Sequence, residues 1–91
     1  MWALVALVVA SAPQNPVEFG RQELARIAGD RAANVEVSVK PGPVKEAYTI
    51  VSEGGKVRIV GSDANGAMYG AFEFAERLQN EGETAWSTRA S

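Results

Sequence analysis

The carboxylate side chains are the groups in this sequence whose types and spacing could do chemistry. Two carboxylates that converge in a pocket can hydrolyse a glycosidic bond or transfer a proton. Glu73 and Glu76 are three residues apart, but both fall on the polar face of a predicted helix, which favours a solvated surface. Glu23 is interpreted as an ion-pair or solvent-exposed residue, and Asp63 as a helix N-cap. The carboxylates therefore predict no catalytic residue in this chain.

The sequence lacks the residues that most often serve in nucleophilic catalysis and metal binding. The sequence contains no cysteine and no histidine, which removes thiol nucleophiles, disulfides, and the commonest general base and metal ligand. Ser11, Ser38 and Ser52 consequently have no histidine to activate them. The turn from Gly61 to Gly66 lacks the GxGxxG spacing and the lysine of a phosphate-binding loop, so an anion site there stays only an alternative. We expect no catalytic residue, no cofactor site and no metal site.

Length and composition are those of one small domain. The 91 residues are 46 % hydrophobic and 22 % charged, as in ordinary globular proteins. A net charge of −2 with scattered lysine and arginine argues against a nucleic-acid partner. The apolar run from Met1 to Ala12 ends in a triplet like a signal-peptidase site, so a secretory leader is the alternative interpretation. The run follows no lysine or arginine, is very short for such a signal, and is too short to span a membrane. We expect no membrane partner, and we interpret Ala3 to Val9 as a buried β-strand.

A helix is predicted to follow this strand after a short loop. Asn15 is its N-cap, Pro16 occupies the first helical position, and Glu18 can complete a capping box. Gly20 permits a close approach, and Gly29 ends the helix. The apolar stripe of this helix consists of Val17, Leu24, Ile27 and Ala28.

Three further strands are predicted from apolar residues that recur at every second position. They run from Val35 to Val39, from Ala47 to Ser52 and from Val57 to Val60. The last two are separated by Glu53 to Lys56, in which two adjacent glycines supply the positive φ angles of a tight turn. We therefore expect these two strands to form an antiparallel hairpin.

The stretch from Gly61 to Leu78 is the longest periodic segment and predicts a second amphipathic helix. Asp63 is its N-cap, and Glu73, Glu76 and Arg77 form its polar face, with an i,i+4 ion pair between Glu73 and Arg77. Its apolar arc consists of Met68, Ala71, Phe72, Ala75 and Leu78, widened by Ala67, Gly70 and Phe74. Gly66 and Gly70 disfavour a helix, which indicates close packing of the helix on the sheet, or alternatively a ligand at the backbone.

The predicted elements make a single α+β domain in the order β-α-β-β-β-α, with both helices on one face of a mixed four-stranded sheet. The first β-α-β unit should cross over right-handed and place its two strands parallel. The domain covers residues 1–80, and residues 81–91 are interpreted as a linker or tail in which Trp86 docks. The second face of the sheet is partly apolar and is a candidate contact surface, the alternative being a mildly hydrophobic solvent face. This face carries Glu36, Ser38, Thr49, Val51, Arg58 and Val60.

Four stretches carry a resemblance to a known type of domain. They are LVALVVAS, FGRQELARIAG, AYTIVSEGGKVRIVGSD and GSDANGAMYGAFEFAERLQ, which together span Ala3 to about Gln79. They resemble the small N-terminal α+β domain that precedes the catalytic barrel in α-glucuronidases of family 67 and β-N-acetylhexosaminidases of family 20. The departure is Asn65, where many relatives carry arginine. The positions that match the family pattern are Tyr48, Ile50, Val57, Ile59, Gly61, Asp63, Gly66, Tyr69 and Gly70.

The resemblance implies a non-catalytic accessory domain of a glycoside hydrolase. In such enzymes the catalytic carboxylates belong to the following (β/α)₈ barrel, so no catalytic residue is carried over to this chain. The expected partner is that barrel in the same polypeptide, docked on the second sheet face or on the helix face around Tyr69. The alternatives are an interaction module that forms a homodimer through the open sheet face, and a carbohydrate-binding module. A sugar site would need an exposed aromatic platform, for which the candidates are Trp2, Tyr48, Tyr69 and Trp86.

Overall fold

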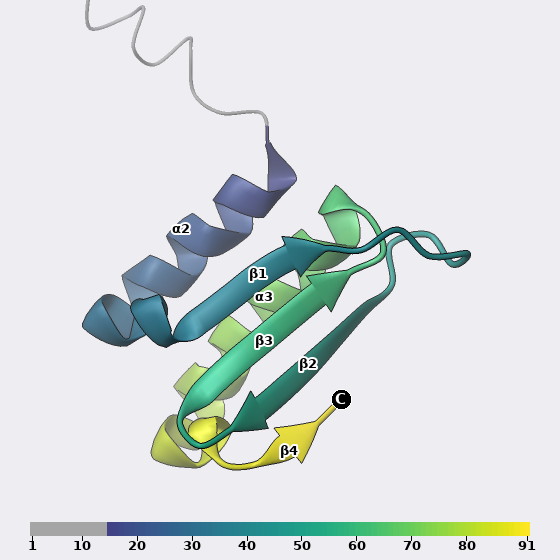
Figure 1. The fold of residues 1–91 in the computed structure, drawn as a ribbon. Coiled ribbons are helices and arrows are strands. Elements are labelled where there is room, and N and C mark those ends of the chain that lie inside the picture. The colour runs from purple at the N-terminus through teal and green to yellow at the C-terminus, as the bar shows by residue number, and fades with distance from the viewer. Residues whose placement is uncertain (1–14) are drawn as a thin grey trace, which may run out of the picture.

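Two helices lie on one side of a mixed four-stranded sheet in a computed structural model that describes residues 15–91 (Figure 1). The sheet order is β1-β3-β2-β4, with β1 parallel to β3 and the other neighbours antiparallel. The predicted α+β class is thereby confirmed. The strand predicted at Ala3 to Val9 lies outside the described residues. In chain order the elements are α2 (Pro16–Ala28), the 3₁₀ helix η1 (Gly29–Asn34), β1 (Val35–Val39), β2 (Tyr48–Glu53), β3 (Lys56–Gly61), α3 (Ala64–Glu81), the 3₁₀ helix η2 (Gly82–Trp86) and β4 (Arg89–Ala90).

The strands β1, β2 and β3 form as their alternation predicts. The hairpin between β2 and β3 pairs Ile50 with Ile59, and both side chains are fully buried against the helices. Gly54 and Gly55 have φ angles of 61° and 80°, which a two-residue hairpin turn requires and which glycine adopts without strain. The predicted antiparallel hairpin is therefore confirmed.

Side-chain caps begin both helices where they were predicted. The Asn15 side chain accepts a hydrogen bond from the Val17 N–H, and the Asp63 side chain accepts one from the Gly66 N–H. Gly29 ends α2 with a φ of 61°, as predicted. Glu18 does not complete the predicted capping box; its carboxylate instead accepts a hydrogen bond from Arg21, three residues later, at 2.9 Å.

The core lies between the helices and the sheet. The residues that α3 contributes to it differ in part from the apolar stripe predicted for that helix. Phe74 is fully buried, whereas Phe72 is 39 % exposed. The helix turns Gly70 and Phe74 toward the sheet, which places Phe72 outside the contact. The buried apolar residues are Leu24, Val37, Ile50, Val57, Ile59, Ala67, Ala71, Phe74, Ala75, Ala85 and Trp86.

Glycines set the closest contacts of the fold. A methyl group added at Gly70 would lie 2.6 Å from Ile59 Cγ2, and one added at Gly20 would lie 2.8 Å from Ala71 Cβ. At Gly66 it would collide with the backbone carbonyl of Ala47, just before β2. Close packing thus accounts for the helix glycines, and α2 lies beside α3 in the same layer.

The segment after Asn80 is more ordered than the absence of periodicity predicts. It contains η2 and β4, and β4 pairs with β2 through Val51 and Ser52. Trp86 docks as expected: it is 6 % exposed, meets Phe74 edge-to-face at 5.4 Å, and carries the Arg31 guanidinium 4.1 Å above its ring. A two-residue strand is too short to produce a recognisable alternation, so the sequence pattern missed it.

Candidate functional site

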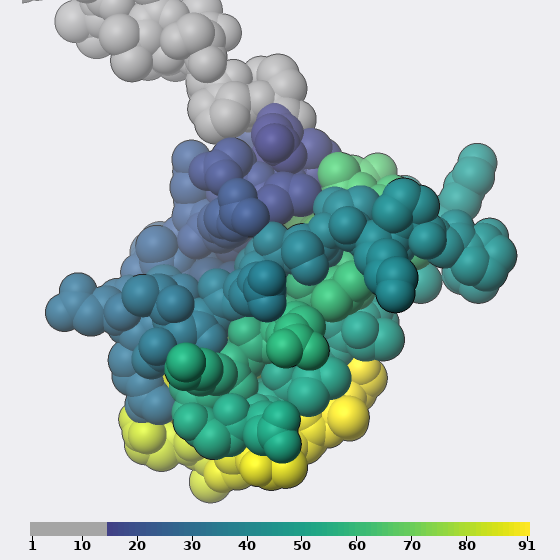
Figure 2. Space-filling view, in the orientation of Figure 1, coloured from purple at the N-terminus to yellow at the C-terminus, as the bar shows by residue number. Residues whose placement is uncertain are grey.

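The face of the sheet that the helices leave uncovered is the candidate functional surface. Figure 1 shows α3 behind the strands and α2 beside it, along the outer side of β1, and Figure 2 shows the strand side chains open to the viewer from the same direction. The covered face buries Val37, Ile50 and Ile59 almost completely. On the opposite face Val51 is 38 % exposed, although it belongs to a strand paired on both sides.

Two cross-strand rows make up this surface, as the register shows. One row runs Glu36, Arg58, Val51 and Ala90, and the next runs Ser38, Val60 and Thr49. Arg58 Nε lies 3.5 Å from Glu36 Oε1, and both side chains are about two-thirds exposed, so solvent screens this pair and its contribution to stability is small. In the first row the charged residues Glu36 and Arg58 lie on β1 and β3, and the apolar residues Val51 and Ala90 lie on β2 and β4. This mixture of charged and apolar side chains is typical of a contact surface rather than of a closed pocket.

Two shallow hollows lie on the uncovered face within residues 15–91. One lies around Glu36, Val51, Glu53, Lys56 and Arg58, where charged side chains of both signs surround the exposed valine. A second is more apolar and lies at the other end of the strands, beside Pro41, Thr49 and Val60. Both are open to solvent, so the surface is suited to another macromolecular face more than to an enclosed small ligand.

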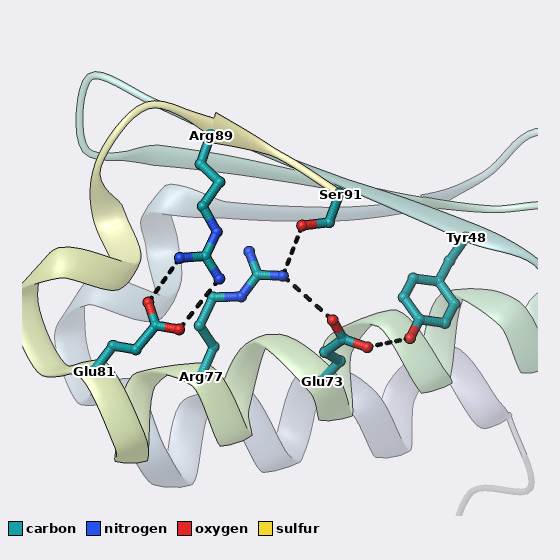
Figure 3. Close-up of polar contacts among 6 residues, drawn as sticks. All are labelled: Tyr48, Glu73, Arg77, Glu81, Arg89 and Ser91. Carbon is teal, nitrogen blue, oxygen red and sulfur yellow. Dashed lines mark hydrogen bonds and ion pairs between the residues drawn. The ribbon is translucent and has the colours of Figure 1, made fainter.

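Behind the sheet, a polar network ties α3 to β2 and to the C-terminal strand (Figure 3). The Tyr48 hydroxyl donates a hydrogen bond to one oxygen of the Glu73 carboxylate, and Arg77 Nη2 lies 3.3 Å from the other oxygen. The same Arg77 nitrogen donates to Ser91 Oγ at 2.9 Å, and Arg89 forms two hydrogen bonds with Glu81. These contacts hold the C-terminal strand against the helix.

The network shifts the acid–base behaviour of Tyr48. Its hydrogen bond to Glu73, reinforced by partial burial and by the negative charge of that carboxylate, raises the pKa of the Tyr48 hydroxyl. A raised pKa keeps the phenol protonated, which opposes a role as a base or a nucleophile. The arrangement is therefore structural.

The carboxylates considered for catalysis do not converge. Glu73 is bonded to Tyr48 and Arg77, whereas Glu76 is exposed. Glu23 forms the predicted ion pair, with Arg26 at 2.7 Å, and this partner lowers the pKa of Glu23. Across residues 15–91 there is no group of three or more histidine, cysteine, aspartate or glutamate side chains that could hold a metal.

At the turn before α3, the Asp63 carboxylate accepts hydrogen bonds from nearby backbone N–H groups. Asp63 Oδ1 accepts the Gly66 N–H at 2.7 Å, and Oδ2 accepts the Glu46 N–H at 3.0 Å. These two backbone bonds lower the pKa of Asp63. Glu46, whose N–H makes the second of these bonds, has a φ of 57°, which is uncommon for a residue other than glycine. A carboxylate at this helix end opposes the alternative of an anion site there.

Sequence patterns missed the burial of Arg77. The pattern predicted Arg77 on the polar face, but its side chain is only 5 % exposed because the C-terminal strand covers it. The i,i+4 pairing with Glu73 was predicted and is present. Arg77 donates a hydrogen bond to Ser91, directly after β4, and the two residues of β4 leave no pattern in the sequence that could have indicated this contact.

The fold buries some of the aromatic side chains that were candidates for a sugar-stacking platform. Trp86 is buried and Tyr48 is partly buried, whereas Tyr69 is 41 % exposed on the outer side of α3; Trp2 lies outside the described residues.

Within residues 15–91, no helix combines the length and apolar character needed to cross a membrane. Comparisons with protein-family models, with curated proteins and with solved structures found no match.

Proposed function

We propose that this chain is a non-catalytic accessory domain of a glycoside hydrolase, which packs against and supports a following catalytic (β/α)₈ barrel. The observation that carries the proposal is the asymmetry of the sheet. One face is closed by α2 and α3, and the other exposes Val51 beside the charged pair of Glu36 and Arg58. An open face of this kind is suited to a second domain of the same polypeptide.

The position of the C-terminal strand supports the same role. Ser91 exchanges two backbone hydrogen bonds with Ile50, at 2.7 Å and 3.0 Å. Residues that follow Ser91 would therefore emerge beside β2, next to Thr49 and Val51 of the uncovered face. A domain that begins there is within reach of this face without a long linker.

The scattered carboxylates support a role without catalysis by this chain. Glycoside hydrolysis by two carboxylates needs the pair on either side of one glycosidic bond. Glu73 is instead engaged by Tyr48 and Arg77, and Asp63 is engaged by two backbone N–H groups. The proposal accordingly assigns hydrolysis to the barrel, and the 91-residue chain alone should not hydrolyse glycosides.

The alternative that uses the same surface is self-association through the uncovered face. Its support is the same exposed Val51, so a test must separate the two occupants of one face. A carbohydrate-binding module has weaker support, because Trp86 is buried and cannot offer a stacking platform.

The proposal can be tested with a thiol introduced into this domain, because its 91 residues contain no cysteine. Val51→Cys places one thiol on the uncovered face, and Val44→Cys is the matched control in the loop between β1 and β2, where Val44 is 62 % exposed. The labelling rate of each thiol is measured in the 91-residue chain and in the longer polypeptide that its reading frame encodes. We expect the thiol of Val51→Cys to react in the short chain and to be protected in the long one, whereas the thiol of Val44→Cys reacts in both.

Equal reactivity of the Val51→Cys thiol in the two polypeptides would contradict the proposal, and so would a reading frame that stops after Ser91. Protection of this thiol in the short chain that increases with protein concentration would indicate self-association instead. Assays of both polypeptides with aryl glycosides complete the test, with hydrolysis expected from the longer one alone.

A further inference from the structure

The outer edge of β1 is the one feature of the sheet that the proposed function does not use. In the described part of the chain β1 pairs only with β3, so it is an edge strand. Lys40 N donates to Gly61 O at 2.9 Å, which shows that the even-numbered residues of β1 direct their backbone groups toward β3. The N–H and C=O groups of Val35, Val37 and Val39 therefore point to the open edge, and such a row can pair with another strand.

An arginine from α2 covers the middle of this edge. Arg21 Nη2 donates a hydrogen bond to the Val37 carbonyl at 2.8 Å, and Arg21 Nη1 is held by Glu18 at 2.9 Å. Arg21 thus occupies the central acceptor of the edge and carries its charge into the path of an incoming strand. Charged side chains placed on an edge are a general means of preventing strand addition.

We propose that Arg21 is an autoinhibitory contact that keeps the edge of β1 closed, and that the strand it excludes is β1 of a second copy of this chain. The inference goes beyond the proposed function, because it concerns the edge of the sheet and not the uncovered face. Removing Arg21 should convert the monomer into a dimer with one continuous sheet.

A second copy fits this edge by its register and its charges. Two β1 strands related by a two-fold axis pair antiparallel. When the axis passes through Val37, Val35 faces Val39 of the other copy, and Glu36 faces Ser38 of the other copy. Apolar residues then meet on the helix side, and no like charges are opposite on the other side.

A strand of the same chain fits this edge less well. With β1 pointing upward, Figure 1 shows α2 deeper than the sheet and to the left of β1, along the open edge. A parallel strand at that edge, joined to β1 through α2, would make a left-handed crossover. Nearly all such crossovers are right-handed, so we commit to the second copy.

The test compares two arginines of α2. Arg21→Ala removes the contact with Val37, and Arg26→Ala is the matched control, because Arg26 also pairs with a glutamate three residues earlier but donates its hydrogen bonds to that glutamate and not to β1. Sedimentation should show that Arg21→Ala changes from the mass of one chain to that of two as concentration increases, while Arg26→Ala and the native chain stay monomeric. A monomeric Arg21→Ala, or equal association of both variants, would overturn the proposal.

Two further variants test the register. Adding Ser38→Glu to Arg21→Ala places two carboxylates opposite each other and should abolish the dimer, whereas adding Ser38→Lys places a lysine opposite Glu36 and should preserve it. The same response to both substitutions would contradict pairing of β1 with itself.

The native chain provides a test that does not depend on any variant folding. Amide hydrogen exchange of Val37 and Val39 should be fast in the native chain at every concentration, and slow for Lys40, whose N–H is bonded to Gly61. Slow exchange of Val37 and Val39 in the dilute native chain would show that a strand already occupies the edge, which would overturn the proposal.

Discussion

The side chains on the two faces of the sheet differ in packing and in exposure to solvent. On the covered face, contacts are so close that Gly70 has no room for a methyl group beside Ile59, and Phe74 is completely buried. On the uncovered face, Val51 is partly exposed and Arg58 and Glu36 form a solvated ion pair. The covered face specifies the fold, and the proposed function assigns the uncovered face to a partner. Substitutions on the first should therefore change stability, and those on the second should change association.

The largest effect is expected for Phe74→Ala. Phe74 is fully buried and contacts Trp86 edge-to-face, so truncation should lower the free energy of unfolding by about 3–5 kcal/mol. Phe72→Ala on the same helix is the control, because Phe72 is 39 % exposed and should lose much less. Urea denaturation measures both, and equal losses would contradict the observed orientation of α3.

A smaller effect is expected for Gly70→Leu. Its side chain would have to enter the contact with Ile59 and Tyr48, and such overpacking costs about 1–3 kcal/mol. Tyr69→Leu is the neighbouring control, at a site that is 41 % exposed. If Gly70→Leu melts at the same temperature as the parent, the close approach of α3 to the sheet is wrong.

Tyr48→Phe tests the polar network behind the sheet. It removes the hydrogen bond to Glu73 and should lower stability by about 1 kcal/mol at neutral pH. Folding raises the pKa of Tyr48, so this stabilisation is complete below the unfolded value of about 10 and is lost as pH increases through the folded value. Urea denaturation at increasing pH should show a loss in the parent that Tyr48→Phe lacks. Tyr69→Phe, on the exposed side of α3, should behave like the parent.

The smallest effect on the fold is expected at Asp63. Its folded pKa is lowered, so its contribution is present above the unfolded value of about 3.9 and is lost as pH falls through the folded value. Asn is also a good N-cap, so Asp63→Asn should fold at neutral pH and should lose less stability than the parent on acidification. Circular dichroism during acid titration checks this, and identical titrations of the two proteins would refute the role of the charge.

Much of the fold could be predicted from local patterns. Alternating valines and isoleucines located β1, β2 and β3, and the capping residues Asn15 and Asp63 located the starts of both helices. These signals are local because each depends on the residue and its nearest neighbours along the chain. The uncovered face followed directly from the same alternation.

The remaining features depend on contacts between distant segments. The choice between Phe72 and Phe74 as the core residue is set by where Gly70 meets Ile59. The burial of Arg77 depends on β4, a strand of two residues that has no periodic signature. The contact of Arg21 with Val37 likewise depends on how α2 lies beside the edge of β1.

The most direct test of the central claim is the effect of Val51→Glu on stability in two settings. In the 91-residue chain, a charge on the uncovered face should change the free energy of unfolding by no more than about 0.5 kcal/mol, as should the control Val44→Glu. In the longer polypeptide, Val51→Glu should lower the unfolding temperature while Val44→Glu leaves it unchanged. A large loss for Val51→Glu in the short chain, or no loss in the long one, would contradict the separation of a folding face from a docking face.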